Sequence, residues 1–432
     1  MPDMFDMLKT KAGSAMAFPA RAWRTLRPAL VSARRAGGRF LEVFSGSDVL
    51  VSVAVVLLGF LVATLILMAI DRNPLGLYQA IVRVTTGFDL RRWGDWDMLM
   101  RTRNLFPVGE WLLVSSPLIL CGLSMGFAAR AGLFNIGAEG QYIAGVTASQ
   151  VIAFMFPPIP GLHAIVAVCG GIAAGAAWGG IAGFFKARFR VSEVVATIMM
   201  NHIALFFHQI ITLRLPDARP DRMPAFPETA TIASPFLSGL TNGSRLNHGI
   251  WLTLIAIVVF WIIMGKTRLG YSLRATGLNR DAAHYGGINV KANITTAMAI
   301  AGGFAGLAGA AVSLGMFPSG RVLPAFEGYG FEGIAVALVG NSTAWGTALS
   351  GLLFGMLRSA QPIMQLWYQI PREITSIIVG MVVIFISLRA GLRLISDWRM
   401  KEKIRLSNAE REHDAGDSAD GDVSGDGTRG GG

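Results

Sequence analysis

Four amide side chains and one carboxylate stand inside or beside otherwise apolar stretches of the 432-residue chain. The amides are Asn135, Gln141, Asn201 and Asn341, and the carboxylate is Glu139. A charged side chain at membrane depth costs about 2.5 to 3.5 kcal/mol on insertion scales, so it normally faces protein or water. Amides both donate and accept hydrogen bonds, which suits sugar hydroxyls and nucleobase edges. The four amides therefore predict a passage for a polar, uncharged solute.

The segment 130–141, RAGLFNIGAEGQ, separates two stretches without charge. Its composition favours neither a buried helix nor a lipid-facing surface, and Gly137, Glu139 and Gly140 predict a polar turn inside the protein. Glu139 has two interpretations. It either accepts hydrogen bonds from backbone N–H groups at a helix start or contacts the solute, and we favour the first.

No catalytic set emerges from the remaining motifs. The chain has no GxxxxGK loop followed by Ser or Thr, no HExxH and no Cys/His spacing for a metal. We therefore expect neither an enzyme nor a directly bound cofactor. The alternative within transport is a secondary transporter or facilitator that works alone. Such a protein is expected to carry ion-coupling carboxylates in its spans, and their scarcity counts against it.

Composition indicates the fold class. Hydrophobic residues make up 53% of the chain and charged residues 15%, and several apolar stretches reach the roughly 20 residues that cross a bilayer. These values predict an all-α polytopic membrane protein. The net charge of +11 lies mostly beside apolar spans, so it indicates topology rather than nucleic-acid binding.

The pattern divides the chain into three parts: a basic cytoplasmic arm (1–47), a transmembrane domain (48–395) and a cytoplasmic tail (396–432). The tail is acidic and Gly-rich after about residue 407, which predicts disorder. Residues 71–110 and 214–248 are expected as outer loops. The basic residues near both termini place both ends in the cytoplasm.

The spans number about ten in this topology. Seven crossings bring the chain outside near residue 314, and the last crossing must run inward, so residues 331–359 have to enter and return. We predict two helices, each shorter than a span, that meet at 340–343. Glycines at every fourth position of residues 171–183 predict a helix packed in the middle of the bundle.

The basic loop 266–293 is predicted on the cytoplasmic side. In it, Asn279 is placed to cap a short helix over 280–285, which Gly286 ends. From the residues alone, this helix either docks a cytoplasmic partner or lies on lipid headgroups.

Three motifs resemble one family. They are GLFNIGAEGQ (132–141), SEVVATIMMNHIAL (192–205) and ATGLNRDAAHYGGINV (275–290). The chain resembles, over about residues 50–395, the permease subunits of bacterial ABC importers for nucleosides and simple sugars, a branched-chain/ribose-type family, and most closely its nucleoside branch. The resemblance implies a type II importer fold with broken helices in the bacterial inner membrane.

The same resemblance implies partners: a cytoplasmic ATPase that uses ATP–Mg, a second permease subunit and an extracytoplasmic solute-binding lipoprotein. The second permease is either a paralogue, which we favour, or a second copy of this chain. It also favours docking over lipid contact for the basic loop, because Ala282, Ala283 and Gly286 match a shortened coupling-helix pattern. The residues then implied in coupling to the ATPase are Gly277, Asn279, Asp281, Ala282, Ala283, Tyr285 and Gly286.

Overall fold

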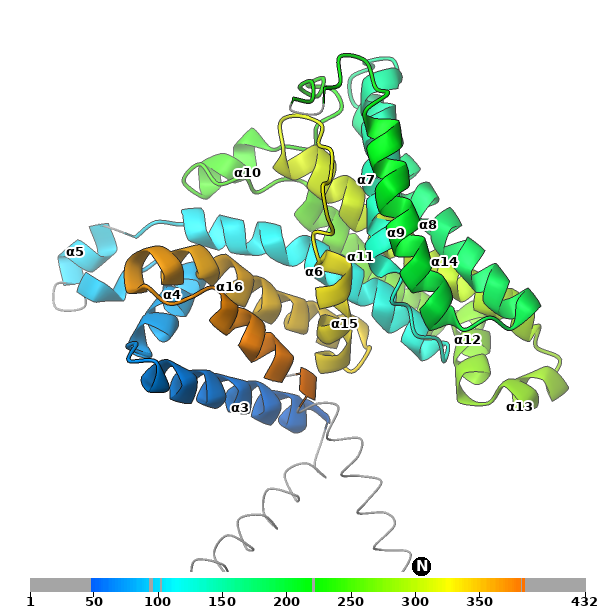
Figure 1. The fold of residues 1–432 in the computed structure, drawn as a ribbon, viewed down its shortest axis with the longest axis horizontal. Coiled ribbons are helices and arrows are strands. Elements are labelled where there is room, and N and C mark those ends of the chain that lie inside the picture. The colour runs from blue at the N-terminus through cyan, green and yellow to red at the C-terminus, as the bar shows by residue number, and fades with distance from the viewer. Residues whose placement is uncertain (1–47, 93–95, 102, 220–221, 382, 385–432) are drawn as a thin grey trace, which may run out of the picture. The chain divides into compact units, whose positions relative to one another are not determined.

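The computed structural model describes residues 48–92, 96–101, 103–219, 222–381 and 383–384. The chain divides into two compact units, one formed by residues 56–386 and one by 1–55 with 387–432. The named elements are helices (Figure 1): α3 (Asp48–Ala69), α4 (Leu75–Thr86), η1 (Leu90–Arg92), α5 (Trp96–Arg101), α6 (Phe106–Arg130), α7 (Ala138–Met155), α8 (Leu162–Phe189), α9 (Glu193–Thr212), α10 (Pro235–Leu240), α11 (Gly249–Lys266), α12 (Arg268–Leu278), α13 (Arg280–Tyr285), α14 (Val290–Met316), α15 (Tyr329–Val339) and α16 (Ala344–Tyr368). Helices α4 to α16 belong to the unit 56–386.

The predicted all-α class is confirmed for the described residues. Among these residues, five helices are long and apolar enough to cross a membrane, namely α6, α8, α9, α11 and α14. The prediction of ten membrane segments stays a prediction. The arm 1–47 and the tail 396–432 lie outside the described residues.

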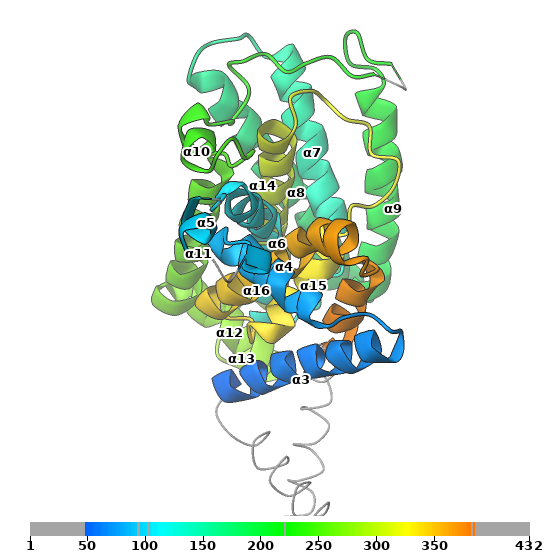
Figure 2. The ribbon, with the colours of Figure 1, turned by 90° about the vertical axis from the view of Figure 1, so that its left-hand side faces the viewer.

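Helices α6 and α14 form the core of the unit 56–386. The most apolar stretch of each is 83% buried, whereas that of α8 is 28% buried. The predicted glycine stripe of α8 does give close packing, because a Cβ on Gly175 would stand 2.4 Å from the carbonyl oxygen of Gly302 on α14. The predicted position of α8 in the middle of the bundle was wrong. Helices α7, α8 and α14 lie side by side (Figure 2), and α8 covers α14 from outside.

The segment 71–110 is not a simple loop. It contains α4, whose Leu77, Ala80 and Val84 are fully buried. This helix packs on α16, and Gly76 stands so close to Tyr368 that a Cβ there would lie 2.6 Å from the ring. The prediction missed this contact because α4 is short and buries only one face.

The chain breaks between α15 and α16 where the sequence predicted it. Gly340 follows α15, and Asn341 and Ser342 have φ values of 51° and 50° before α16 begins at Ala344. Helix α15 has 11 residues and is short as predicted. The predicted short second arm was wrong, because α16 has 25 residues and continues past Ser359 to Tyr368. At 1.5 Å per residue it is about 37 Å long.

Candidate functional site

The turn between α6 and α7 is held by a buried cluster of amides. Asn135 donates from Nδ2 to Oε1 of Gln141 (2.9 Å), and Gln141 donates from Nε2 to Oδ1 of Asn135 (3.0 Å). Asn201 on α9 accepts from the backbone N–H of Gly140 (2.9 Å) and donates to the carbonyl of Ile136 (3.1 Å). All three amides are at most 1% exposed. They fasten the turn to itself and to α9.

Asn341 lies apart from the other three amides, in the break between α15 and α16, and it is exposed. Arg130, the last residue of α6, donates from Nε to the carbonyl of Ser342 (2.8 Å) and from Nη2 to that of Asn341 (3.3 Å). The structure thus gathers Asn135, Gln141 and Asn201 and leaves Asn341 elsewhere. A role of the four in solute passage stays a prediction.

Glu139 connects the turn to a second helix start. Its carboxylate, fully buried, accepts from the backbone N–H of Gly328 (2.9 Å) and of Gly330 (2.6 Å), where α15 begins. The favourable N-terminal dipole of a helix adds to these two hydrogen bonds. These are contacts of the kind that the structural interpretation of Glu139 expects, although the helix is α15 rather than α7.

Gly137 and Gly140 lie where the turn meets α9. A Cβ on Gly137 would stand 2.9 Å from Cβ of Thr197, and one on Gly140 would stand 2.9 Å from Cα of Asn201. Only residues without a side chain allow this approach.

The loop 317–328, between α14 and α15, carries charges that the sequence analysis did not single out. Arg321 binds both carboxylate oxygens of Glu327, at 2.8 and 3.1 Å, and Tyr142 on α7 donates its hydroxyl proton to the same carboxylate (2.5 Å). The side chains of Arg321 and Glu327 are 20% and 21% exposed. A paired, two-point contact of this kind is the geometry in which guanidinium and carboxylate bind most strongly.

A second ion pair joins α15 to α16. Arg358, near the middle of α16, donates to Glu332 on α15 (3.0 Å) and to the carbonyl of Glu327 (3.2 Å). Its guanidinium lies over the ring of Tyr329, 4.2 Å from the centroid. The Arg358 and Glu332 side chains are 26% and 35% exposed.

The loop 317–328 is fastened to α7 and α9. Gln150 accepts from the backbone N–H of Arg321 (3.0 Å), and Gln209 donates to the carbonyl of Leu323 (2.8 Å). His208 accepts on Nε2 from the N–H of Leu323 (3.1 Å), so its Nδ1 carries the proton and faces Thr147 (2.9 Å). His208 is therefore a core residue held in one tautomer.

The segment 266–293, predicted as a basic loop, contains the helices α12 and α13. The side chain of Asn279 accepts from the backbone N–H groups of Asp281 and Ala282 and caps α13, and Gly286 follows its last residue. The predicted cap and helix bounds are confirmed. Gly277 touches the turn, since a Cβ there would stand 2.8 Å from the backbone N of Gly132.

The outer surfaces of α12 and α13 are open. Tyr285 is 91% exposed and Leu278 is 89% exposed. Asp281, Ala282 and Gly286 are exposed as well, whereas Ala283 is buried. Arg280 donates to the carbonyl of Gly132 (3.2 Å), so the segment is also tied to the turn by a side chain.

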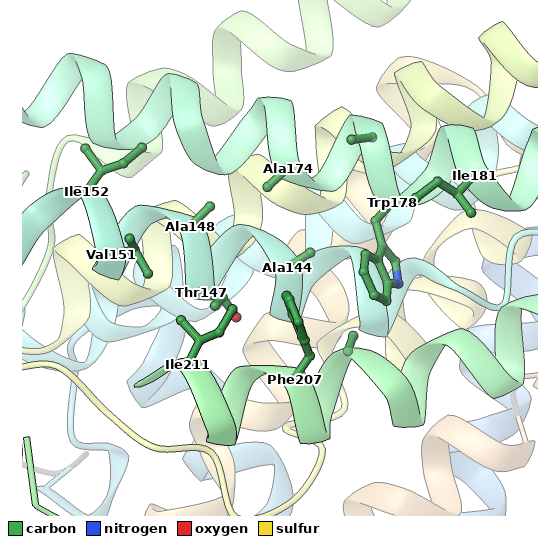
Figure 3. A pocket seen from close by; sticks show the side chains of 12 residues that line it. Ala144, Thr147, Ala148, Val151, Ile152, Ala174, Trp178, Ile181, Phe207 and Ile211 are labelled. Atoms are coloured by element: carbon green, nitrogen blue, oxygen red, sulfur yellow. The ribbon is translucent and has the colours of Figure 1, made fainter. Parts of the chain in front are cut away.

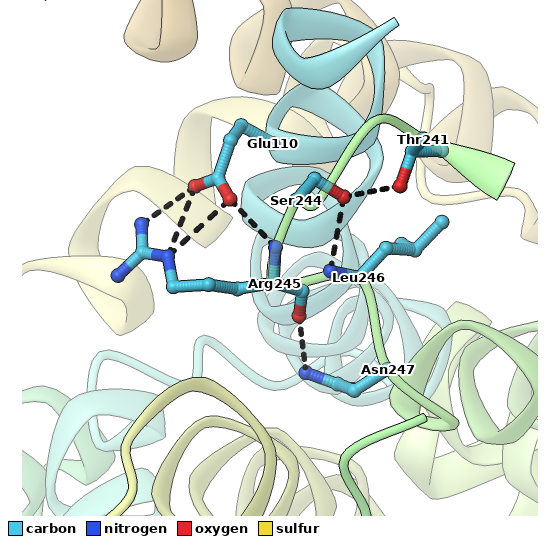
Figure 4. A network of polar contacts seen from close by, with 6 residues as sticks. All are labelled: Glu110, Thr241, Ser244, Arg245, Leu246 and Asn247. Atoms are coloured by element: carbon cyan, nitrogen blue, oxygen red, sulfur yellow. Dashed lines mark hydrogen bonds and ion pairs between the residues drawn. The ribbon is translucent and has the colours of Figure 1, made fainter. Parts of the chain in front are cut away.

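The other end of α6 carries a network of its own (Figure 4). Glu110 accepts from the backbone N–H of Arg245 (2.9 Å) and from its Nη2 (2.6 Å). The hydroxyls of Ser244 and Thr241 contact each other (2.5 Å). Helix α6 thus binds the loop 241–248 at its start and the break at 340–343 at its end.

A family model described as the permease component of a branched-chain amino acid transport system matches residues 108–387, more than half of the chain. The chain belongs to this permease family. Among its relatives, the guanosine ABC transporter permease protein NupP of Bacillus subtilis is 41% identical over 69% of this chain and 86% of its own length. No solved structure matches the chain.

Two further relatives are informative. The nucleoside ABC transporter permease protein NupB of Lactococcus lactis is 35% identical over 79% of the permease and 91% of its own length. A second guanosine ABC transporter permease protein of Bacillus subtilis, NupQ, is 28% identical over 57% of the permease and 79% of its own length. The permease is a transport subunit and a multi-pass membrane protein, as predicted.

The charged residues of the permease that the sequence analysis missed come from the loop 317–328, from the first turn of α15 and from α16. Arg321 and Glu327 are six residues apart, but Glu332 and Arg358 are separated by a complete helix break. One Arg and two Glu within 317–332 were a visible signal. Their pairing with Tyr142 depends on a contact across 185 residues, which no local pattern encodes.

Proposed function

We propose that the permease is one half of the membrane passage of an ATP-driven importer for nucleosides. The observation that carries the solute class is its 41% identity to a permease named for guanosine, over 86% of that relative's length. The 35% identity to a second permease named for nucleosides supports the same class. The importer lies in the cytoplasmic membrane with about ten segments, a type II fold and both termini inside.

A cytoplasmic ATPase binds at residues 277–286, the end of α12 and the whole of α13, in this proposal. Support comes from Leu278 and Tyr285, two large side chains about nine-tenths exposed, and from the capped, short α13. The ATPase binds and hydrolyses ATP–Mg. Its closure moves α13, and rigid-body movement of the helices then changes the side to which the passage opens.

The movement reaches the passage through backbone contacts. Gly277 lies against Gly132, Arg280 binds the carbonyl of Gly132, and Arg130 binds the break at 340–343. The turn continues into Glu139, which holds the start of α15. The segment 277–286, with Gly277, Asn279, Asp281, Ala282, Ala283, Tyr285 and Gly286, is thus the proposed coupling element.

The second subunit of the passage is a paralogue rather than a copy of this chain. Bacillus subtilis has two proteins named guanosine permease, NupP and NupQ, and the permease is 41% identical to one and 28% identical to the other. An extracytoplasmic lipoprotein delivers the nucleoside to the outer loops, including 214–248. The amides Asn135, Gln141, Asn201 and Asn341 lie along the proposed passage or hold its shape.

The experiment is co-purification of the complex from its native membrane, followed by an ATPase assay in proteoliposomes with binding protein and guanosine. We expect an ATPase subunit to accompany the permease, and guanosine-loaded binding protein to stimulate hydrolysis. Removal of the exposed ring by Tyr285→Ala should lower the stimulated rate. Tyr271→Ala on α12, also exposed at 66%, serves as the matched control.

Transport of guanosine by the permease alone, without ATP, would overturn the proposal and support a facilitator. Stimulation by a sugar-loaded binding protein, with none by guanosine, would keep the importer and change its solute class.

A further inference from the structure

We propose that an aromatic cluster formed by His202, Phe326 and Phe331 is the surface on which the base of the solute stacks inside the passage. The proposal rests on the proposed function and adds a binding site to it. The three side chains come from α9, from the loop 317–328 and from α15. Ring centroids are 5.1 Å apart for His202 and Phe326, and 5.7 Å apart for Phe326 and Phe331.

The position of His202 argues against a surface that faces lipid. It lies at the midpoint of α9, a 20-residue helix apolar enough to span a membrane. It is exposed, and every other exposed residue from 195 to 210 on α9 is apolar. A polar ring at the centre of a span normally faces protein or water.

The ion pair of Glu332 with Arg358 is a second, independent observation on which surface faces lipid. Phe331 is followed by Glu332, whose partner Arg358 lies near the middle of α16. Both charged side chains remain partly exposed, at 35% and 26%. Partly exposed charges need water or protein opposite them, so the surface at Glu332 and Arg358 does not face lipid chains.

The cluster has the chemistry of a base-binding surface. Phe331 is 39% exposed, and base stacking on aromatic side chains tolerates different bases because each base has a π-face. Nδ1 of His202 donates to the carbonyl of Ile198 (3.2 Å), which leaves Nε2 as an acceptor for an N–H of a base. Glu332 follows Phe331 in sequence, and with its partner Arg358 it offers an acceptor and donors for ribose hydroxyls.

The test is the number of guanosine molecules imported per ATP hydrolysed, measured with the complete complex in proteoliposomes. Phe326→Leu and Phe331→Leu keep an apolar side chain and remove the ring. Each should lower the ratio about tenfold, which corresponds to the loss of one stacking contact, while the loaded binding protein still stimulates the ATPase. Phe326→Tyr and Phe331→Tyr keep the ring and should retain the ratio.

Phe207→Leu is the matched control. Phe207 is on the same helix, is 52% exposed, and stacks on Trp178 on another side of α9. The number of guanosine molecules that this variant imports per ATP hydrolysed should not change. An unchanged ratio in both cluster variants, or an equal fall in the control, would overturn the proposal.

A second measurement uses the unmodified complex, so the proposal stays testable if a variant does not assemble. Illumination with 8-azidoguanosine during turnover should label peptides within 198–206 or 322–334. Labelling confined to other segments would refute the proposed binding of the base at the aromatic cluster. Failure of the proposed function is distinct, because guanosine-loaded binding protein would then not stimulate the ATPase of the unmodified complex.

Discussion

Two sides of α9 differ in the chemistry of the segments that lie against them. On one side, an apolar groove of about 370 Å³ lies between α7, α8 and α9, and Phe207 and Trp178 line it with several alanines (Figure 3). On the other side, His202 meets Phe326 of the loop 317–328. The lining of the groove is apolar apart from Thr147 and the indole N–H of Trp178, whereas the other side carries the imidazole of His202.

The difference comes from what covers each side. The groove is closed by helices that are near in sequence, α7 and α8, and its hydroxyl, that of Thr147, is already bonded to the carbonyl of Ile143 and to His208. The other side receives the loop 317–328, through Gln209 with Leu323 and His202 with Phe326. Two sides of one helix therefore have different surroundings, and segments far away in sequence decide which side is polar.

The largest expected effect is on the polar side. Arg321→Met leaves Glu327 and the hydroxyl of Tyr142 without their cation, in a site about four-fifths buried. Breaking a buried pair on one side costs about 3 kcal/mol. The thermal midpoint of the purified complex should fall clearly. The double variant Arg321→Met/Glu327→Gln removes the uncompensated charge and should recover part of the loss; no recovery would contradict the role of the pair.

Glu139→Gln tests the contact that holds the start of α15. The amide keeps one acceptor and loses the charge that two backbone N–H groups bind, which costs about 1.5 to 3 kcal/mol. We expect less folded complex by size-exclusion chromatography. Normal assembly with an altered solute preference would instead assign Glu139 to substrate contact.

His202→Leu compares the two sides of α9 directly. If the His202 side bordered lipid, leucine would stabilise the protein and leave transport unchanged. We expect the reverse: an unchanged thermal midpoint and several-fold less guanosine imported per ATP, because a base acceptor is lost. Ile203→Leu is the control, since Ile203 is the next residue and is 55% exposed.

The smallest effect is expected away from both sides of α9, at Asp89. The hydrogen bond from Arg91 outweighs burial and lowers the pKa of Asp89 from 3.8 to about 2. Because the pKa of Asp89 is lower in the folded state than in the unfolded state, the ionised carboxylate stabilises the folded state at pH values above about 4. This stabilisation is lost as the pH falls from about 4 to 2. Asp89→Asn should therefore cost about 1 kcal/mol at pH 7.

The measurement for Asp89 is the thermal midpoint of both proteins at pH 7 and at pH 3. The difference in thermal midpoint between the unmodified protein and Asp89→Asn should be smaller at pH 3 than at pH 7. A constant difference would show that the effect of the substitution is not electrostatic. Arg72→Gln, a surface charge with no ion pair among the described residues, gives the baseline.

Local patterns predicted the elements that local chemistry controls. Asn279 capped α13 at the predicted residues because its side chain reaches N–H groups only two and three positions ahead. The break at 340–343 followed from a polar, Gly-containing run between apolar arms. Close packing of Gly175 on α14 followed from its helical spacing.

The same patterns failed where a contact spans the chain. They placed α8 in the middle of the bundle, because a small-residue stripe shows that a backbone comes close and does not show how many sides are covered. They treated residues 71–110 as a loop, because α4 gains stability from packing on α16 rather than from its own sequence.

The sequence by itself determined the all-helical membrane class, the polar turn at 130–141, the capped helix at 280–285 and the family, because each depends on composition, spacing or a local hydrogen bond. Only the tertiary structure decided that Asn135, Gln141 and Asn201 bind one another or the backbone, that Glu139 holds a distant helix start, and that His202 meets Phe326. The physical reason is that buried polar groups must find partners, and in this chain those partners come from segments far apart in sequence.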